Sequence, residues 1–371
     1  MTKDEVSRRA FMRTGSAAAA AAMAGVALPA KAASEPRIKW RLVSSFPTTL
    51  DVIHGGIELI ARRVKELTDG KFEISVFPAG EIVPGYQVLD AVQQGTTECG
   101  VTCGFYYLGK LPALVFDTCL PFGMTPRQQD AWMNYGGGLE LMRELYGQFG
   151  VLQFPCGGTG AQMGGWFRSE IKSAGDLKGL RIRTPGFVSE VYARLGAVPQ
   201  QIAHSDVYSS LEKGTLDAVE IIGPHDDEKL GLWKAAKFYY SPGVLELDAQ
   251  LSFIVNKSRW DGLPPTYQAA VAVASAEART KMIAKYDAVN IAALRRLLAN
   301  GVKLRYWPED VVKAMYKATV DLLQEKSQAD PLFAKVHKQW DDFRAGQSLW
   351  SSINDGAAEH YVMAFAKQSG K

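Results

Sequence analysis

The chain has 371 residues, enough for two domains that each bury a core. Apolar residues make up 47% and charged residues 22%, a composition typical of globular rather than disordered proteins. The formal charge of +3 arises at the N-terminus: removing the five basic and two acidic residues of positions 1–32 from the totals of 42 and 39 leaves 37 of each. This balance excludes a strongly basic surface, so we expect no nucleic-acid partner.

The first 32 residues are typical of an export signal. Ser7-Arg8-Arg9-Ala10-Phe11-Met12 is a twin-arginine motif, a weakly apolar run follows over 15–28, and Ala30-Lys31-Ala32 offers a cleavage site. No later apolar run is long enough to span a bilayer. We therefore predict a periplasmic protein that leaves the cytoplasm by the twin-arginine route.

Residues 38–102 contain strand-like and helix-like apolar patterns in turn. Alternating apolar residues predict strands over 38–44, 72–77 and 98–102. Helical spacing predicts helices over 51–68, ending at Asp69-Gly70, and from Pro84 to Gln94-Gly95. This order predicts an α/β fold with parallel strands and right-handed crossovers.

A second α/β unit follows the same order. We expect strands over 181–183 and 218–222, an extended segment over 198–202, and helices over 187–195 and from Ser205, a plausible cap, to Gly214. Residues 251–256 read as a buried strand of the first unit. Beyond Pro264 the chain is mostly helical, with helices expected over 266–299, 309–325, 330–345 and 350–367.

These patterns predict two α/β domains with a ligand cleft between them. The first domain comprises 37–156 together with about 251–335, and the second comprises 157–250. The long C-terminal helices of about 336–371 either pack across the two domains of a monomer or form a dimer interface.

Four cysteines remain after the signal: Cys99, Cys103, Cys119 and Cys156. An oxidising compartment permits disulfides, and four cysteines allow three pairings among which sequence does not choose. The spacing of Cys99 and Cys103 suits neither a redox pair nor a zinc ribbon. Buried free thiols are the favoured interpretation.

Enzyme motifs are absent from the sequence. The five histidines form no HExxH motif, and no G-x-S-x-G elbow, Walker loop or dinucleotide fingerprint occurs. Gly157-Gly158-Thr159-Gly160 resembles a phosphate cradle but lacks the following lysine. We therefore expect no enzyme. The alternative is a periplasmic metal-dependent enzyme that acts on a small carboxylate, which only the acidic residues support.

Arginines close the short strand 181–183. An arginine at a strand end can present its planar fork to a carboxylate. Arg181 and Arg183 are two residues apart and share a face, so sequence does not separate them, and each can instead form a surface ion pair.

Other candidates are polar residues in apolar or glycine-rich surroundings. Gln162 lies in the glycine-rich segment 157–166, while Glu220 and Glu246 each stand among apolar residues. The alternative for each glutamate is a solvent-facing place on an alternating strand. Tyr106 and Tyr107 either offer hydroxyls to a ligand or belong to the core. We expect Arg183, Gln162 and Glu220 to form the floor of a ligand cleft.

Four segments carry a resemblance to a known family: Gly158-Thr159-Gly160-Ala161-Gln162-Met163-Gly164-Gly165-Trp166-Phe167-Arg168, Asp176-Leu177-Lys178-Gly179-Leu180-Arg181-Ile182-Arg183, Leu195-Gly196-Ala197-Val198-Pro199 and Gly223-Pro224-His225-Asp226-Asp227. With the export signal and the opening strand-helix-strand order, they resemble solute-binding proteins of tripartite ATP-independent periplasmic (TRAP) transporters. The closer similarity is to the branch that binds 2-oxo acids and lactate. The resemblance spans nearly all of the mature chain.

The resemblance implies a receptor that captures a small monocarboxylate, a 2-oxo or 2-hydroxy acid, and delivers it to the membrane permease subunits. It implies that Arg183, rather than Arg181, pairs with the substrate carboxylate. It also implies a cation that bridges protein and substrate. The implied cation ligands are Gln162, Glu220, the backbone carbonyl near Ile221, and Glu246, and the further substrate-binding candidates are Tyr106, Tyr107, Trp166 and Phe187. Oxygen ligands with two negative charges favour Ca²⁺ over Na⁺.

Three positions depart from the family pattern. Gly158 stands where asparagine is expected, Ile221 where tryptophan is usual, and Val244-Leu245 where the branch is more aromatic. These departures predict a wider and more apolar cavity.

Overall fold

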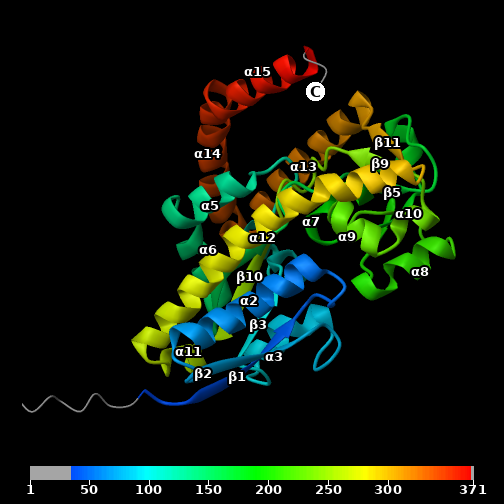
Figure 1. The fold of residues 1–371 in the computed structure, drawn as a ribbon. Coiled ribbons are helices and arrows are strands. Elements are labelled where there is room, and N and C mark those ends of the chain that lie inside the picture. The colour runs from blue at the N-terminus through cyan, green and yellow to red at the C-terminus, as the bar shows by residue number, and fades with distance from the viewer. Residues whose placement is uncertain (1–34, 369–371) are drawn as a thin grey trace, which may run out of the picture. The chain divides into compact units, whose positions relative to one another are not determined.

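The structure, a computed structural model, describes residues 35–368. The chain divides into an N-terminal unit, Met1–Arg37, and a compact unit, Ile38–Lys371. The expected twin-arginine signal lies outside the described residues. Every helix and strand discussed below belongs to the second unit (Figure 1). Within the described part of the chain, no helix is both long and apolar enough to cross a membrane.

The first sheet contains five strands. In spatial order they are β2 (Phe72–Phe77), β1 (Ile38–Ser44), β3 (Cys99–Thr102), β10 (Gln250–Asn256) and β4 (Val151–Gly158). Strand β1 is parallel to β2 and β3, which confirms the expected crossover arrangement. Strand β10 is antiparallel to β3 and β4 and is buried except at its last residue, so it joins the first sheet as expected.

The second sheet contains six short strands. In spatial order they are β11 (Lys303–Tyr306), β9 (Phe238–Ser241), β5 (Gly165–Phe167), β8 (Ala218–Val219), β6 (Arg181–Arg183) and β7 (Val198–Gln200). Strand β6 is parallel to β7 and β8, whereas β5 is antiparallel to β8 and β9. Strand β8 ends three residues earlier than expected, so Glu220 lies beyond the ladder. Strands β4, β5, β9 and β11 were not expected, because glycine, proline or aromatic residues interrupt their alternation.

The eight helices expected from the sequence are present, although the one expected over 330–345 continues to Ile353. Helices over 115–118, 126–135, 138–147, 232–235 and 257–261 were not expected. The helices are α2 (Asp51–Leu67), α3 (Val88–Gln93), α4 (Val115–Thr118), α5 (Pro126–Tyr135), α6 (Gly138–Gly147), α7 (Gly186–Arg194), α8 (Val207–Glu212), α9 (Pro224–Lys229), α10 (Leu232–Ala235), α11 (Lys257–Asp261), α12 (Pro265–Ala299), α13 (Glu309–Ala329), α14 (Pro331–Ile353) and α15 (Asp355–Gln368). Helix α2 buries Val52, Ile53, Ile57, Ile60 and Val64, and it ends before Asp69 and Gly70, which both have positive φ.

The expected cap at Ser205 is wrong. Residues His204–Asp206 form a short 3₁₀ turn, and α8 begins after it with Asp206 at the cap position and no side-chain capping bond. The hydroxyl of Ser205 instead donates to Oδ1 of Asp206 at 3.3 Å. A 3₁₀ turn often precedes an α-helix, and here it shifts the helix start by two residues.

Helix α12 contacts elements that pack beside both sheets. It packs against α2 and β4 near its N-terminal part and against α9 farther along (Figure 1). Its buried residues include Ala274, Ser275, Ala278, Arg279 and Met282, so one charged side chain lies on its buried face.

The backbone passes between the sheets three times. The first crossing segment, residues 159–164, links β4 to β5, and the second crossing segment, residues 242–249, links β9 to β10. The third connection runs from β10 through α11 and α12 to β11. The first two connections lie close to the boundaries expected at 156 and 250, and the domain division itself stays a prediction.

Candidate functional site

The two crossing segments are hydrogen-bonded to each other at Gln162. The amide of Gln162 donates to the carbonyl of Glu246 at 3.0 Å, and the amide of Gly243 donates to the carbonyl of Gln162 at 3.1 Å. A Cβ atom at Gly243 would lie 2.3 Å from that carbonyl oxygen, so this close approach requires glycine. Two residues far apart in sequence, Gln162 and Glu246, are thereby brought together.

A small cavity lies beside this junction. Its volume is about 20 Å³, room for about one water molecule, so a larger ligand requires the lining to move apart. Its lining includes five residues predicted for the site, namely Tyr106, Gln162, Arg183, Ile221 and Glu246. Glu220 and Glu246 line an adjoining space with Met163, Gly164 and Trp307.

Three buried side-chain oxygens in this region have no hydrogen-bond donor among residues 35–368. They are Oε1 of Gln162, Oε1 of Glu220 and Oε1 of Glu246. The residues are 5%, 3% and 2% exposed, so bulk water does not solvate these atoms. An unsatisfied buried acceptor costs about 1–3 kcal/mol, and more when it is charged. Carboxylate and amide oxygens are the ligands that a hard cation prefers, and these three could supply part of its coordination shell.

The two carboxylates are held in an environment that favours their neutral forms. Burial raises the pKa of Glu220 to about 8, with the charge of Arg183 opposing this shift and that of Asp227 adding to it. Burial, followed by the charge of Glu220, raises the pKa of Glu246 well above its ordinary value. A cation between them would remove both penalties, so the residues present fit a bound metal ion.

Arg183 is fixed on the floor of the cavity. It is 1% exposed, its Nη1 donates to the carbonyl of Glu220 at 2.7 Å, and its Nε donates to the carbonyl of Ile202 at 3.1 Å. Its Nη2 has no partner in the described chain. A buried guanidinium with one free N–H group is prepared to bind an anion.

Arg181 has a different environment from Arg183. It forms a two-bond pair with Asp217, with distances of 2.8 Å from Nε to Oδ2 and 2.6 Å from Nη2 to Oδ1. Its side chain is 43% exposed. The structure therefore separates the two arginines that sequence reasoning left equivalent.

His204 also lines the cavity and was not among the predicted site residues. Burial, and then the charge of Arg183, holds its pKa well below the ordinary value, so the ring is neutral. His204 belongs to no recognisable sequence motif. It reaches the cavity through a 3₁₀ turn over His204–Asp206, which the sequence pattern did not predict. Thr184 and Thr159 were also missed: the Thr184 hydroxyl donates to Oε2 of Glu220 at 3.4 Å, and Nε2 of Gln162 donates to the Thr159 hydroxyl at 3.3 Å.

Three predicted substrate-binding residues lie outside the cavity lining. Nε1 of Trp166 donates to Oδ2 of Asp227 at 2.9 Å. The Tyr107 hydroxyl lies 2.8 Å from that of Thr102 and accepts from the amide of Leu89 at 3.1 Å. Phe187 is buried at 2% exposure within the core cluster. The structure brings Tyr106, but not these three, to the cavity.

The four cysteines are free thiols. Cys103 lines the cavity, and burial raises its pKa well above the ordinary value, which keeps the thiol neutral.

Two α/β sheets, joined by crossing segments that carry a buried small-molecule site, define the class of periplasmic solute-binding proteins. Residues 43–329 match the family model "Bacterial extracellular solute-binding protein, family 7". The chain belongs to this family.

Three relatives within this family are similar to the chain over most of its length. A "monocarboxylate 2-oxoacid-binding periplasmic protein" of Nostoc is 46% identical over 327 residues, which are 88% of this chain and 90% of the relative. A TRAP solute-binding protein from Bordetella bronchiseptica, solved as a mixed-occupancy dimer with co-purified calcium and picolinate, is 46% identical with a TM-score of 0.89. The alignment covers 90% of this chain and 99% of that one.

The third relative is a TRAP periplasmic solute-binding protein from Pseudoalteromonas atlantica, solved with sodium and pyruvate. It is 36% identical with a TM-score of 0.85, covering 87% of this chain and 99% of that one. These neighbours confirm the expected two-sheet α/β fold. They also confirm that relatives of this chain bind a cation together with a small carboxylate.

Proposed function

We propose that this chain is the receptor of a TRAP transporter that captures a small 2-oxo or 2-hydroxy monocarboxylate through Arg183 and a bound cation. The observation that carries the proposal is the set of unsatisfied groups around the cavity: three acceptor oxygens and one guanidinium N–H group. A cation would accept Gln162, Glu220 and Glu246 as ligands, and the organic acid would complete its shell. The substrate carboxylate would also bind Nη2 of Arg183.

Charge balance supports a divalent cation and a monocarboxylate. Among the side chains that line the two spaces, the two glutamates and Arg183 together carry one negative charge when both glutamates are ionised, and His204 is neutral. Asp227, whose charge also acts on Glu220, lies outside this lining and accepts hydrogen bonds from Trp166 and Tyr239. A divalent ion brings this total to plus one, which a monocarboxylate neutralises. A second carboxylate would remain uncompensated in a buried site, at a large desolvation cost. Ca²⁺ suits the all-oxygen ligands, and Na⁺ is the alternative.

Calorimetric titration of pyruvate into the Ca²⁺-loaded protein tests the arginine. We expect Arg183→Met to abolish binding, because the variant loses the charge and the free N–H group. Arg181→Met is the matched control, since Arg181 lies on the same strand but pairs with Asp217 at the surface. Pyruvate affinity that is unchanged in Arg183→Met, or lost equally in both variants, would contradict the proposal.

We propose that the site binds its ligand without chemical turnover. Both carboxylates would be occupied by the cation, which leaves neither as a general base. His204 and the raised pKa of Glu220 are the features that an enzyme could use. Mass spectrometry of a 2-oxo-acid panel after incubation with the protein should return each acid unchanged. Any converted product that depends on Glu220 would favour the enzymatic alternative.

We place the receptor in the periplasm, as the family and the twin-arginine motif suggest, with TRAP permease subunits as its recipients. We further propose that a second copy of the chain packs against helices α14 and α15 (Figure 1) and covers their exposed apolar side chains. Leu349, Trp350, Ile353, Val362 and Met363 are each more than half exposed. The Bordetella relative, solved as a dimer, supports this assembly.

The dimer is tested by light scattering after size exclusion. We expect the mature chain to have the mass of a dimer and an Ile353→Glu, Val362→Glu variant to have that of a monomer. Tyr135→Glu, at a residue 93% exposed on a different helix, should leave the mass unchanged. A monomeric mass for the unmodified chain would contradict the assembly.

A further inference from the structure

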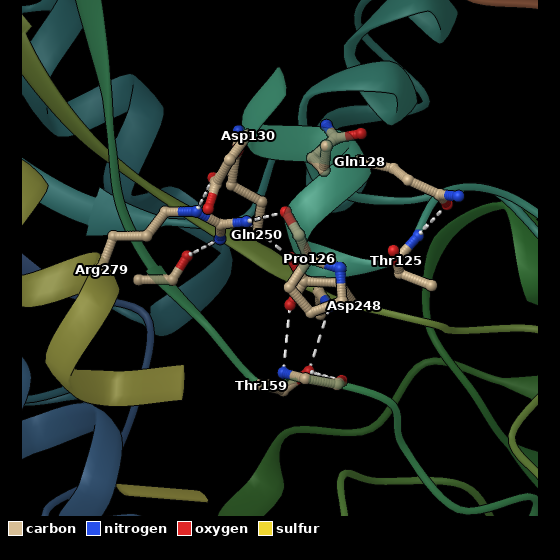
Figure 2. A network of polar contacts seen from close by, with 12 residues as sticks. Thr125, Pro126, Gln128, Asp130, Thr159, Asp248, Gln250 and Arg279 are labelled. Atoms are coloured by element: carbon tan, nitrogen blue, oxygen red, sulfur yellow. Dashed lines mark hydrogen bonds and ion pairs between the residues drawn. The ribbon is translucent and has the colours of Figure 1, made fainter. Parts of the chain in front are cut away.

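Arg279 connects helix α12 to both sides of the candidate site (Figure 2). It is 4% exposed, and its Nη1 donates to the carbonyl of Gly157 at 2.5 Å, just before the first crossing segment. Its Nη2 donates to Oδ2 of Asp248 at 2.8 Å, within the second crossing segment. Its Nε pairs with Asp130 on α5. One guanidinium therefore holds three separate parts of the chain.

Asp248 and its neighbour Ala249 are hydrogen-bonded to residues next to Gln162. Its Oδ1 accepts from the amide of Gly160 at 3.1 Å. The amide of Ala249 donates to the Thr159 hydroxyl at 3.0 Å, and that hydroxyl also accepts from Nε2 of Gln162. The path from Arg279 to Gln162 therefore consists of hydrogen bonds between buried groups.

Backbone positions beside Arg279 are adapted to it. A Cβ atom at Gly158 would lie 2.5 Å from Nη1 of Arg279 and 2.8 Å from Oδ1 of Asp248. This ion pair occupies the space beside the backbone at Gly158, so a side chain at this position would have to displace Arg279 and Asp248 from their present places.

Stability alone does not account for a buried ion pair at this place. Moving two charges out of water is costly, and well-packed apolar residues of similar volume are often at least as stabilising. A planar fork that bonds several acceptors at fixed angles does, however, define the relative position of those acceptors. The ion pair of Arg279 and Asp248 can therefore fix the position of the two crossing segments relative to each other.

We propose that Arg279 is a positioning residue for the cation site: by holding Gly157 and Asp248 together, it fixes the crossing segments so that Gln162 and Glu246 face one ion. This inference rests on the proposed function. Arg279 itself does not line the cavity, so its effect acts through the ligands it positions.

The test compares cation binding with folding in four variants: Arg279→Met, Arg279→Lys, Arg279→Met with Asp248→Asn, and Arg63→Met. The last is the matched control, because Nε of Arg63 bonds Oε2 of Glu277 at 2.7 Å on the same helix, away from the crossing segments. The probes are Ca²⁺ titration by calorimetry and Tb³⁺ luminescence lifetimes in H₂O and D₂O, which count the waters left on the ion. Melting temperatures are measured without cation.

We expect Arg279→Met to weaken Ca²⁺ binding by about 10- to 100-fold and to leave about one more water on Tb³⁺, since the loss of residues that orient metal ligands has effects of this size. Arg279→Lys should recover part of the affinity, because it keeps the charge but not the simultaneous bonds. Arg63→Met should change only the melting temperature. The double variant, which leaves no unpaired buried charge, should fold and still bind Ca²⁺ weakly.

Two results would overturn the inference. One is unchanged Ca²⁺ affinity and Tb³⁺ hydration in Arg279→Met or, if that variant does not fold, in the double variant. The other is an equal loss of affinity in Arg63→Met, which would assign the effect to general destabilisation. Failure of the unmodified protein to bind Ca²⁺ would instead contradict the proposed function.

Discussion

Arg183 and Glu220 are joined by two hydrogen bonds: the amide of Glu220 donates to the carbonyl of Arg183 at 2.9 Å, and Nη1 of Arg183 donates back to the carbonyl of Glu220 at 2.7 Å. The residue proposed to bind the substrate anion therefore also holds a residue proposed to bind the cation. Displacing either should disturb the other, so substrate and cation binding should be coupled.

Glu246→Gln should separate function from stability. The substitution replaces a buried carboxyl group, whose pKa burial and the charge of Glu220 raise well above its ordinary value, with an amide that never ionises, so the cation-free melting temperature at pH 8 should equal or exceed that of the unmodified protein. Ca²⁺ affinity should fall by more than about 100-fold, because the loss of a residue that only orients a metal ligand already costs about 10- to 100-fold. Calorimetric titration and differential scanning calorimetry measure the two effects. A Glu246→Gln variant that binds Ca²⁺ normally would remove Glu246 from the ligand set.

Cation binding should release protons near neutral pH. The pKa of Glu220 is about 8, so in the cation-free protein at pH 7 this group is mostly protonated, whereas a metal ligand must be deprotonated. Ca²⁺ affinity should therefore rise as the pH increases from 6 to 8, with about one proton released from Glu220 per ion at pH 7 and a further contribution from Glu246, whose pKa burial also raises. Titrations in buffers of different ionisation enthalpy count the protons. An affinity that is independent of pH over this range would contradict the prediction.

Asp117 should make stability depend on pH. Burial raises its pKa from 3.8 to about 6, although hydrogen bonds from Ser252, Tyr146 and Gln250 oppose the shift. The folded state therefore retains a proton that the unfolded state has released, so the contribution of Asp117 to the free energy of unfolding falls as the pH rises from about 4 to 6.

Asp117→Asn should reduce that dependence and lower the free energy of unfolding at pH 7 by about 1–3 kcal/mol, because an amide group would face donors that now bond a carboxylate oxygen. Urea denaturation at several pH values measures both effects. Asp342→Asn, at an exposed pair with Lys338, is the control and should change neither. The same pH slope in Asp117→Asn as in the unmodified chain would disprove this role.

Removal of the cation should weaken substrate binding. Chelation leaves Gln162, Glu220 and Glu246 unsatisfied and deprives the substrate of its second contact, so pyruvate affinity should fall by more than about 10-fold, within the usual range of coupling energies. Pyruvate titrations with a chelator and with excess Ca²⁺ measure the difference. By reciprocity, pyruvate should tighten Ca²⁺ binding by the same factor. Equal pyruvate affinities in the two conditions would show that the ion has no part in recognition.

Local sequence patterns predicted the positions of the long helices well. They identified only some of the residues of the candidate site. Helix α2 has regular apolar spacing, and helix α12 is rich in alanine, leucine, lysine and glutamate and ends at Asn300-Gly301, so the bounds of both were expected within one or two residues. Strand β5 was not expected, because its three residues begin with Gly165 at a φ of 104° and have no room to alternate. Short strands gain their stability from neighbours that are distant in sequence.

The candidate site likewise contains residues that local patterns identify and residues that only long-range contacts bring into place. Arg183, Gln162 and Glu220 lie in segments whose pattern is recognisable in the sequence. Arg279 has a weak signal, a charged residue on the apolar face of an alanine-rich helix, and its partner Asp248 lies 31 residues away. That pairing depends on how the second crossing segment meets α12, which no local pattern encodes.

The first and second crossing segments are the short covalent connections between the sheets, so any relative motion of the sheets must bend them. The same segments carry Gln162 and Glu246. Under the proposed function, a cation shared by these two residues would be a reversible cross-link at the point where the sheets bend relative to each other. The stiffness of the receptor and its affinity for the organic acid would then both depend on one ion.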